Sequence, residues 1–175
     1  MDIYKPKFTR LQQGIFRLLC IKAGQSLSQR EIARLLKVSP TAIGKAVKGM
    51  DLIKVEKSSM NLNSISLDRD KAISLKRAEN LRLIHESGLA DHLEESFPGC
   101  AIILFGSYSM GEDTVSSDID IAVIGSKEKK IDPETYERLL ERDININHYQ
   151  ELSAIKKNLR ENIINGIVLS GHVEL

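Results

Sequence analysis

The sequence has no apolar run that approaches the roughly 18 residues needed to cross a bilayer, so no membrane-spanning segment is expected. Its first ten residues, MDIYKPKFTR, lack the apolar stretch of a secretory signal. Only two cysteines occur, Cys20 and Cys100, and neither belongs to a Cys-x-x-Cys pair or another metal-ligand spacing. These absences favour two reduced core thiols in a cytoplasmic protein with no membrane partner.

Net charge is also nearly absent, at +1, but this sum conceals a division along the chain. Residues 1–60 contain 12 Lys or Arg and 4 Asp or Glu, whereas residues 61–175 contain 13 and 20. A basic part with a net charge of +8 is therefore joined to an acidic part of −7. This asymmetry predicts a basic module that meets a polyanion, or else charge clusters that serve only solubility.

Three helices are predicted in the basic part. Residues 8–22 carry apolar side chains at helical spacing. Ser28 and Glu31 have the spacing of a capping box, which predicts a second helix over about 29–37. Its expected inward residues are Ile32, Leu35 and Leu36.

The third helix and a hairpin follow. Ser39 is the expected N-cap and Pro40 the first-turn proline of a helix over roughly 40–50. Two short helices joined by a tight turn are typical of a helix-turn-helix. Residues 52–67 then alternate around a polar Ser-Ser-Met-Asn centre, which predicts a β-hairpin.

Three helices and a hairpin resemble a winged helix-turn-helix domain, over residues 1–67. In that family the third helix enters the DNA major groove and the hairpin wing lies along the backbone. The resemblance implies a set of DNA-facing side chains, namely Arg30, Arg34, Thr41, Lys45, Lys48, Lys54 and Lys57. The outward face of the third helix has no Arg, Asn or Gln to read base edges, so only modest sequence specificity is expected. Protein docking or dimerisation is the alternative role.

Residues 69–88 have a continuous helical pattern that ends at Gly88, and a short acidic helix follows. We expect this connecting segment, 68–98, to pack the two modules together, with homodimer formation as the second option. His85 and His92 have no third ligand nearby, so no metal site is predicted there.

A Gly-Ser pair and two alternate aspartates flank a turn in the acidic part. The run CAIILF (100–105) predicts a buried strand, and Gly106-Ser107 follows it at a short helical turn whose free N–H groups suit phosphate. In the next run, DIDIAVIG, Asp118 and Asp120 share one face of a strand because side chains alternate. Two carboxylates this close repel unless a cation lies between them, and Mg²⁺ binds both carboxylate and phosphate oxygens.

The pattern Gly106-Ser107-x10-Asp118-x-Asp120 resembles the signature of the nucleotidyltransferase superfamily typified by DNA polymerase beta. The resemblance covers about residues 88–170, and the small size is most similar to the minimal nucleotidyltransferases. It implies a small mixed β-sheet flanked by helices.

The resemblance also implies a substrate and site residues. An NTP, expected to be ATP, would lie with its triphosphate over Gly106 and Ser107, with Ser117 beside it. Asp118 and Asp120 would hold Mg²⁺, and an acceptor hydroxyl would attack the α-phosphorus so that pyrophosphate leaves.

Two departures from the family pattern bear on activity. The third acidic residue of the family corresponds to Asn145 in the later strand 142–150, with Asn147 or Asp143 on the same face. Asn is a poorer Mg²⁺ ligand than a carboxylate, so transfer is expected to be slow or absent if Asn145 is the third position.

The second departure is that Met110 replaces an Arg that related sequences often carry. Lys127, Lys129 or Lys130 could supply a cation instead, or the lysines are simply solvated. Beyond them, the apolar residues at helical spacing predict a closing helix that Gly166 ends; they are Leu152, Ile155, Leu159, Ile163 and Ile167.

The sequence thus predicts an α+β protein with a winged helix (1–67), connecting helices (68–98) and a nucleotidyltransferase domain (99–175). The predicted function is Mg²⁺-dependent transfer of a nucleoside monophosphate to a hydroxyl, with catalytic residues Asp118, Asp120 and Asn145. A protein is a plausible acceptor, because related minimal enzymes include antitoxin-type proteins that modify a partner toxin. The alternative is a DNA-binding regulator whose degenerate transferase domain only senses nucleotide or mediates association.

Overall fold

The computed structural model describes residues 7–57, 63–127, 129 and 131–173. The chain forms two compact units, Met1–Ala72 and Ile73–Leu175. The boundary between them falls inside one helix, α4 (Arg69–Glu86), rather than in a loop. Residues 73–98, most of the segment predicted to connect the modules, are part of the second unit.

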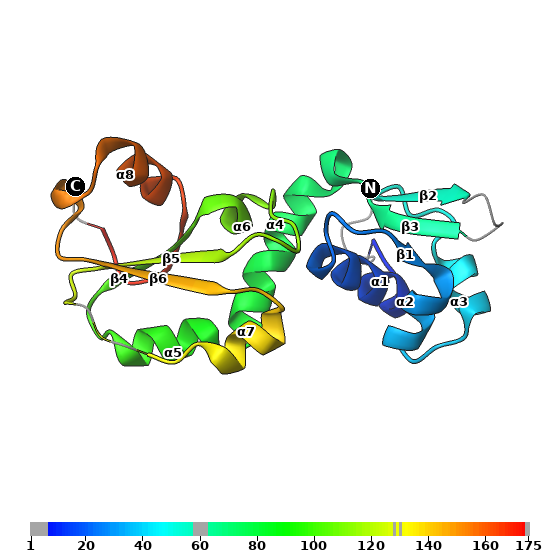
Figure 1. Ribbon diagram of the computed structural model, residues 1–175, viewed down its shortest axis with the longest axis horizontal. Coiled ribbons are helices and arrows are strands. Elements are labelled where there is room, and N and C mark those ends of the chain that lie inside the picture. The colour runs from blue at the N-terminus through cyan, green and yellow to red at the C-terminus, as the bar shows by residue number, and fades with distance from the viewer. Residues whose placement is uncertain (1–6, 58–62, 128, 130, 174–175) are drawn as a thin grey trace. The chain divides into compact units, whose positions relative to one another are not determined.

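The first unit has a winged helix-turn-helix fold (Figure 1). Its elements are α1 (Arg10–Ile21), β1 (Leu27–Ser28), α2 (Gln29–Leu35), α3 (Pro40–Ala46), β2 (Ile53–Lys57) and β3 (Asn63–Leu67). The strands β2 and β3 form the antiparallel hairpin expected from the alternating pattern, and β1 pairs with the other edge of β3. The Ser-Ser-Met-Asn centre of that hairpin lies outside the described residues.

The predicted capping residues begin α2 and α3. The Ser28 hydroxyl accepts a hydrogen bond from the Glu31 N–H at 3.2 Å, and the Glu31 carboxylate accepts one from the Ser28 N–H at 2.6 Å. The hydrogen bond that the Ser28 N–H donates to the Glu31 carboxylate is the main cause that lowers the pKa of Glu31. At α3, the Ser39 hydroxyl accepts from the Ala42 N–H at 3.2 Å, and Pro40 stands in the first turn as expected.

Two details of the helix-turn-helix differ from the prediction. α3 ends at Ala46, so Lys48 lies in the following turn rather than on the helix. Helical spacing predicts Leu35 inside, but this side chain is 46% exposed. The buried face of α2 is centred on Ile32, Ala33 and Leu36, and at 3.6 residues per turn Leu35 lies about 100° from its middle.

The second unit is built around a four-stranded mixed sheet with strand order β6-β5-β4-β7. Its elements after α4 are α5 (Leu89–Ser96), β4 (Ala101–Phe105), α6 (Gly106–Met110), β5 (Ile119–Ile124), α7 (Glu134–Leu140), β6 (Ile144–Tyr149), the 3₁₀ turn η1 (Leu152–Ala154), α8 (Lys157–Ile164) and β7 (Ile167–Ser170). β5 pairs antiparallel with β4 and parallel with β6, and β7 pairs antiparallel with β4. The predicted small mixed sheet flanked by helices is confirmed.

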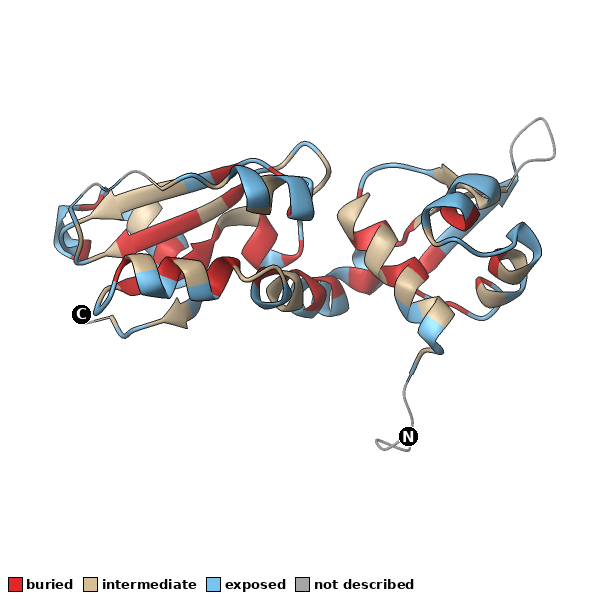
Figure 2. Ribbon diagram, turned by 90° about the horizontal axis from the view of Figure 1, so that it is seen from below, coloured by how far each residue is buried: buried red, intermediate tan, exposed pale blue. Residues whose placement is uncertain are grey.

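The two inner strands of the sheet, β4 and β5, are largely buried on both faces, whereas the edge strands β6 and β7 are mostly half-buried. Figure 1 shows α5 and α7 on one side of the sheet and α8 on the other. On the α5 side, alternate residues of β4 and β5 pack against Leu89, Leu93 and Phe97. On the α8 side, Ile103, Phe105 and Ala122 pack with residues of η1 and α8, among them Leu152 and Ile163. Figure 2 shows that buried stretches alternate with exposed outer faces along the ribbon.

The C-terminal segment differs from the predicted closing helix. α8 ends at Ile164, and Ile167 lies in strand β7, which extends the sheet beyond β4. At Gly166 an added Cβ would lie 2.5 Å from the Leu104 carbonyl oxygen, so only glycine allows the chain to approach β4 here. The β-branched pair after it then favours a strand. Helix α7 is a further element that the sequence pattern does not predict.

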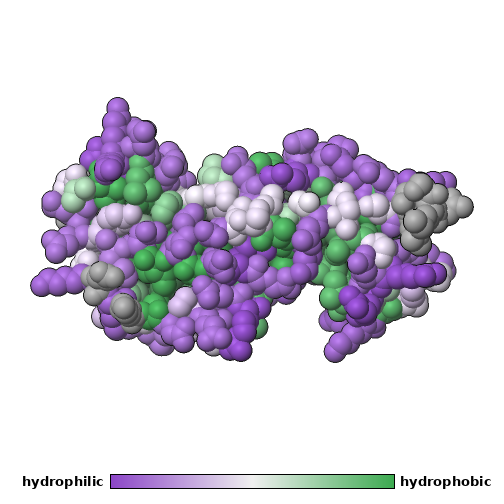
Figure 3. Space-filling model, viewed as in Figure 1, coloured by the Kyte–Doolittle hydropathy of each residue, from purple (hydrophilic) through white to green (hydrophobic). Residues whose placement is uncertain are grey.

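Hydrophilic residues cover most of the visible face of each unit, with small apolar groups between them (Figure 3). None of the helices in the described residues combines the length and apolar character that a membrane crossing requires. The two cysteines are free thiols, Cys20 buried and Cys100 half-buried.

Replacing Ser28 with alanine tests the capping box. Ser28→Ala removes the acceptor for the Glu31 N–H and is expected to lower the free energy of unfolding of the first unit by about 1 kcal/mol. Ser26→Ala, at an exposed serine of the same turn, is the control and should leave it unchanged. Denaturant unfolding followed by circular dichroism measures both; equal stability of the two variants would contradict the capping role.

Candidate functional site

Strand pairing brings three polar side chains together at one end of the sheet. Asp120 pairs with Phe105 of β4 on one side and with Asn145 of β6 on the other. Asp118 directly precedes β5, where the Ile119 N–H donates to the Asp143 carbonyl at 2.8 Å. Because side chains alternate along a strand, Asp118 and Asp120 lie on the same face as Asn145.

The Asn145 amide joins the two carboxylates. Its Nδ2 donates to Asp118 Oδ2 at 3.0 Å and to Asp120 Oδ1 at 3.3 Å. Both carboxylates therefore converge on one point, and the amide N–H groups offset part of their repulsion there. Of the three expected third positions, Asn145 is the one that contacts both aspartates.

The Gly106 turn presses against the same carboxylate. Gly106 has a φ of +73°, and a Cβ at this position would lie 2.6 Å from Asp120 Oδ2. Only glycine combines this backbone conformation with so close an approach. The turn opens α6, whose second residue is the half-buried Ser107, so the predicted Gly-Ser pair and the Asp pair are neighbours in space.

Ser117 belongs to the turn that leads into Asp118. Its hydroxyl accepts a hydrogen bond from the Thr114 N–H at 3.0 Å, and its own N–H donates to the Thr114 carbonyl at 3.0 Å. Ser117 and Asp118 line a pocket of about 390 Å³ together with the α7 residues Glu134 and Arg138.

The arrangement fits a divalent cation bound through two carboxylates. Mg²⁺ is usually held in proteins by one or two carboxylates, several waters and substrate phosphates, which the converging Asp118 and Asp120 allow. Among the residues that the structure describes, no three Asp, Glu, His or Cys side chains form a larger ligand cluster.

Met110 stands where related sequences often carry an arginine, and the lysines expected to supply a cation in its place lie away from the aspartate pair. Lys129 donates to the Ser96 carbonyl at 3.1 Å and stands 5.7 Å from the centre of the Phe97 ring. Lys127 follows the opposite end of β5 from Asp118, and Lys130 lies outside the described residues. Neither described lysine is placed at the carboxylate pair.

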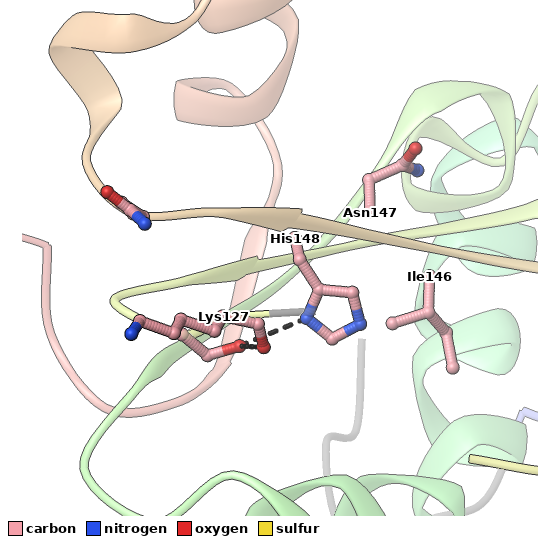
Figure 4. Close-up of a pocket in the computed structure, with 6 residues that line it drawn as sticks. Lys127, Ile146, Asn147 and His148 are labelled. Atoms are coloured by element: carbon pink, nitrogen blue, oxygen red, sulfur yellow. Dashed lines mark hydrogen bonds between the residues drawn. The ribbon is translucent and has the colours of Figure 1, made fainter. Parts of the chain in front are cut away.

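Lys127 lines a second pocket of about 390 Å³ at the far end of β6 (Figure 4). His148 and Ile146 point to one side of the strand there, whereas Asn147 points to the other. The Ser126 hydroxyl lies 3.0 Å from His148 Nδ1. The alternation in this view is the same one that puts Asn145 and Asn147 on the aspartate face.

Tyr149 is a residue of the aspartate face that sequence reasoning missed. Burial raises the pKa of its phenol, and the negative charge of Asp120 raises it further. Tyr149 therefore stays protonated at neutral pH and can donate a hydrogen bond. The signal for it was its place two residues beyond Asn147 on β6.

The predicted DNA-facing side chains of the first unit are all exposed. Arg30 and Arg34 lie on α2, Thr41 and Lys45 on α3, Lys48 in the turn after it, and Lys54 and Lys57 on β2. The ammonium group of Lys54 lies 3.7 Å from the carboxylate of Asp68, and this negative charge partly offsets the positive charge of Lys54. The other charged groups of this set carry positive charge on an exposed helix-turn-helix and wing.

Comparisons with known proteins bear on both units. Residues 89–173 match the family model "Polymerase beta, Nucleotidyltransferase". A comparison with curated proteins found no match.

Three solved structures illustrate the wider similarity, each with a low TM-score. A mutant of ZitR from Lactococcus lactis is 25% identical over 55% of this chain and 65% of its own, with a TM-score of 0.41. The adhesin competence repressor AdcR from Streptococcus pyogenes is 22% identical over 52% of this chain and 67% of its own, with a TM-score of 0.41. A mutant of the toxin–antitoxin MntA-HpeT is 23% identical over 55% of this chain and 73% of its own, with a TM-score of 0.30. This chain thus spans just under two thirds of the length of ZitR.

Replacing Gly106 with alanine tests its contact with Asp120. Gly106→Ala adds left-handed backbone strain and a collision with the carboxylate, so it should lower the free energy of unfolding of the second unit by roughly 2–3 kcal/mol. Gly99→Ala is the control, because Gly99 has a similar φ of +79° and nothing within 4 Å of an added Cβ. It should lower that free energy by only about 1–2 kcal/mol. Equal losses in calorimetry would mean that the contact is unimportant.

Proposed function

Because residues 89–173 form a nucleotidyltransferase domain of the polymerase beta family, we propose that this chain moves a nucleoside monophosphate from an NTP to a hydroxyl acceptor. The observation that carries the proposal is the convergence of Asp118 and Asp120 beside Gly106. A carboxylate pair next to a strand-to-helix turn supports both cation binding and phosphate binding in one place.

Each part of the site has a proposed role. Backbone N–H groups at Gly106 and Ser107, with the Ser117 hydroxyl, bind the triphosphate. Asp118 and Asp120 hold Mg²⁺, which supplies neutralisation of the phosphate charge when bound. The acceptor oxygen then bonds to the α-phosphorus, the bond to the bridging oxygen breaks, and pyrophosphate leaves with that electron pair while the hydroxyl proton passes to solvent. ATP is the proposed NTP.

Asn145 favours a second candidate function. The resemblance makes Asn145 the position of a third carboxylate that would help to hold the metal, and a neutral amide is a poorer Mg²⁺ ligand, so such a site favours nucleotide binding over transfer. In that case the chain is a DNA-binding regulator whose second unit senses nucleotide. A protein acceptor and a homodimer are further parts of the proposal.

Substitution of Asn145 separates the two functions. Asn145→Asp brings a third carboxylate to the site, so Mg²⁺ affinity should rise about tenfold and pyrophosphate release from ATP should increase. Without metal the same variant should unfold more easily, because it loses two amide hydrogen bonds and adds repulsion. Asn147→Asp is the matched control, since it adds the same charge two residues further along the same face.

Labelled ATP with Mg²⁺ and a pyrophosphate assay provide the measurement, with Asp120→Ala as the inactive reference. Equal signals from wild type and Asp120→Ala, combined with Asp120-dependent ATP binding, would favour the nucleotide sensor. A gain of transfer in Asn145→Asp alone would show that the third position limits activity.

The basic first unit is proposed to bind DNA through its phosphates. Lys45→Ala/Lys48→Ala should weaken binding to duplex DNA and reduce the slope of log K against log salt by about 0.9 for each phosphate that is no longer neutralised. Lys156→Ala/Lys157→Ala removes the same charge from exposed positions of the second unit and should not change the slope. Fluorescence anisotropy at several salt concentrations measures it; an unchanged slope in the first variant would point to protein docking.

A further inference from the structure

A buried ionic cluster lies behind the candidate site. Asp113 belongs to the segment between α6 and β5 that also carries Asp118, and it is only 1% exposed. Its carboxylate is paired with the ammonium group of Lys76 and, at 3.3 Å, with the guanidinium of Arg142. Asn80 Nδ2 donates to Asp113 Oδ1 at 2.7 Å. Lys76, Asn80 and Arg142 are themselves at most 5% exposed.

These partners come from separate parts of the second unit. Lys76 and Asn80 lie on α4, and Asn80 also donates to the Tyr108 carbonyl of α6 at 2.8 Å. Arg142 lies two residues before β6, next to Asp143, whose carbonyl accepts from Ile119. One carboxylate therefore ties α4, the entry to β6 and the segment before β5 to one another.

The segment is also pressed directly onto α4. At Gly111, with a φ of +77°, an added Cβ would lie 2.6 Å from the Ile73 carbonyl oxygen and 2.9 Å from the Arg77 nitrogen. Gly111 and Asp113 thus fix the first half of the segment, and the Thr114–Ser117 turn fixes the half that ends at Asp118.

Stability alone is a weak explanation for such a cluster. Desolvating three charges opposes their attraction, and apolar side chains of similar volume are often equally or more stabilising in such positions. What paired buried charges provide in addition is one defined geometry, because each must keep its partners.

We propose that Asp113, Lys76 and Arg142 are positioning residues that set the Asp118 carboxylate against Asp120 for binding of the cation and phosphate. The inference rests on the proposed function of the site. The three residues act on the aspartate pair through the backbone of the segment 111–118 and of the β6 entry, which their ion pairs hold together.

Arg142→Met tests the proposal, because a purely electrostatic effect of Arg142 and a positioning role predict opposite changes in the affinity for a divalent cation. In this variant Lys76 and Asp113 still form an ion pair with no net charge, so the second unit should still fold. Loss of a nearby positive charge would by itself strengthen binding of a divalent cation. If Arg142 positions Asp118, binding should instead weaken, by about tenfold for a misplacement equivalent to 1.4 kcal/mol.

Mn²⁺ serves as the probe, measured by electron paramagnetic resonance with and without ATP, alongside near-ultraviolet circular dichroism. Arg77→Met is the matched control, because Arg77 is an exposed arginine of α4 that does not line the pocket beside Asp118. It should leave Mn²⁺ affinity unchanged or slightly higher. Should Arg142→Met not fold, Lys76→Met/Asp113→Leu/Arg142→Met replaces it, since that variant buries no charge and loses net positive charge as well.

A folded Arg142 variant, or triple variant, that binds Mn²⁺ as tightly as wild type or more tightly overturns the positioning role. If wild type nevertheless transfers nucleotide, the proposed function is retained and only the positioning role is refuted. If wild type binds Mn²⁺ through Asp120 but releases no pyrophosphate, transfer is refuted and the positioning role is still decided by the Arg142 variant. Absence of Asp120-dependent Mn²⁺ binding in wild type would refute both.

Discussion

The repulsion between the carboxylates of Asp118 and Asp120 is the constraint around which the second unit is arranged. Their side chains are brought to one face by the alternation of β5 and converge on the Asn145 amide, 3.0 and 3.3 Å away. The Gly106 turn closes against Asp120 from β4. The Asn145 amide therefore offsets part of this repulsion, and the glycine at 106 allows the turn to approach Asp120 closely.

Much of this could be predicted from local sequence. The capping residues Ser28 and Ser39, the hairpin, the strand before Gly106 and the strand that carries the aspartates all follow from patterns a few residues long. The family resemblance named Asn145 as the third position, with Asn147 and Asp143 as alternatives, and the strand register then pairs Asn145 with Asp120. Such features depend on short-range rules of capping and alternation.

Features that depend on distant neighbours could not be predicted in this way. Ile167 fits a helical repeat, yet it lies in a strand because β4 offers a free edge and Gly166 allows the approach. Leu35 fits a helical repeat, yet it is exposed because it lies about 100° from the middle of the buried face of α2. Asp113 resembles any loop carboxylate in the sequence, since Lys76 and Arg142 are respectively 37 and 29 residues away.

The boundary between the two units has a consequence for dissecting the protein. Because it falls within α4, between Ala72 and Ile73, a truncation at that point would cut a continuous hydrogen-bonded helix. A fragment that starts at Ile73 would expose up to four backbone N–H groups close to Lys76 and Asn80. Fragments of either unit therefore need to include the whole of Arg69–Glu86 if each is to keep its native helix ends.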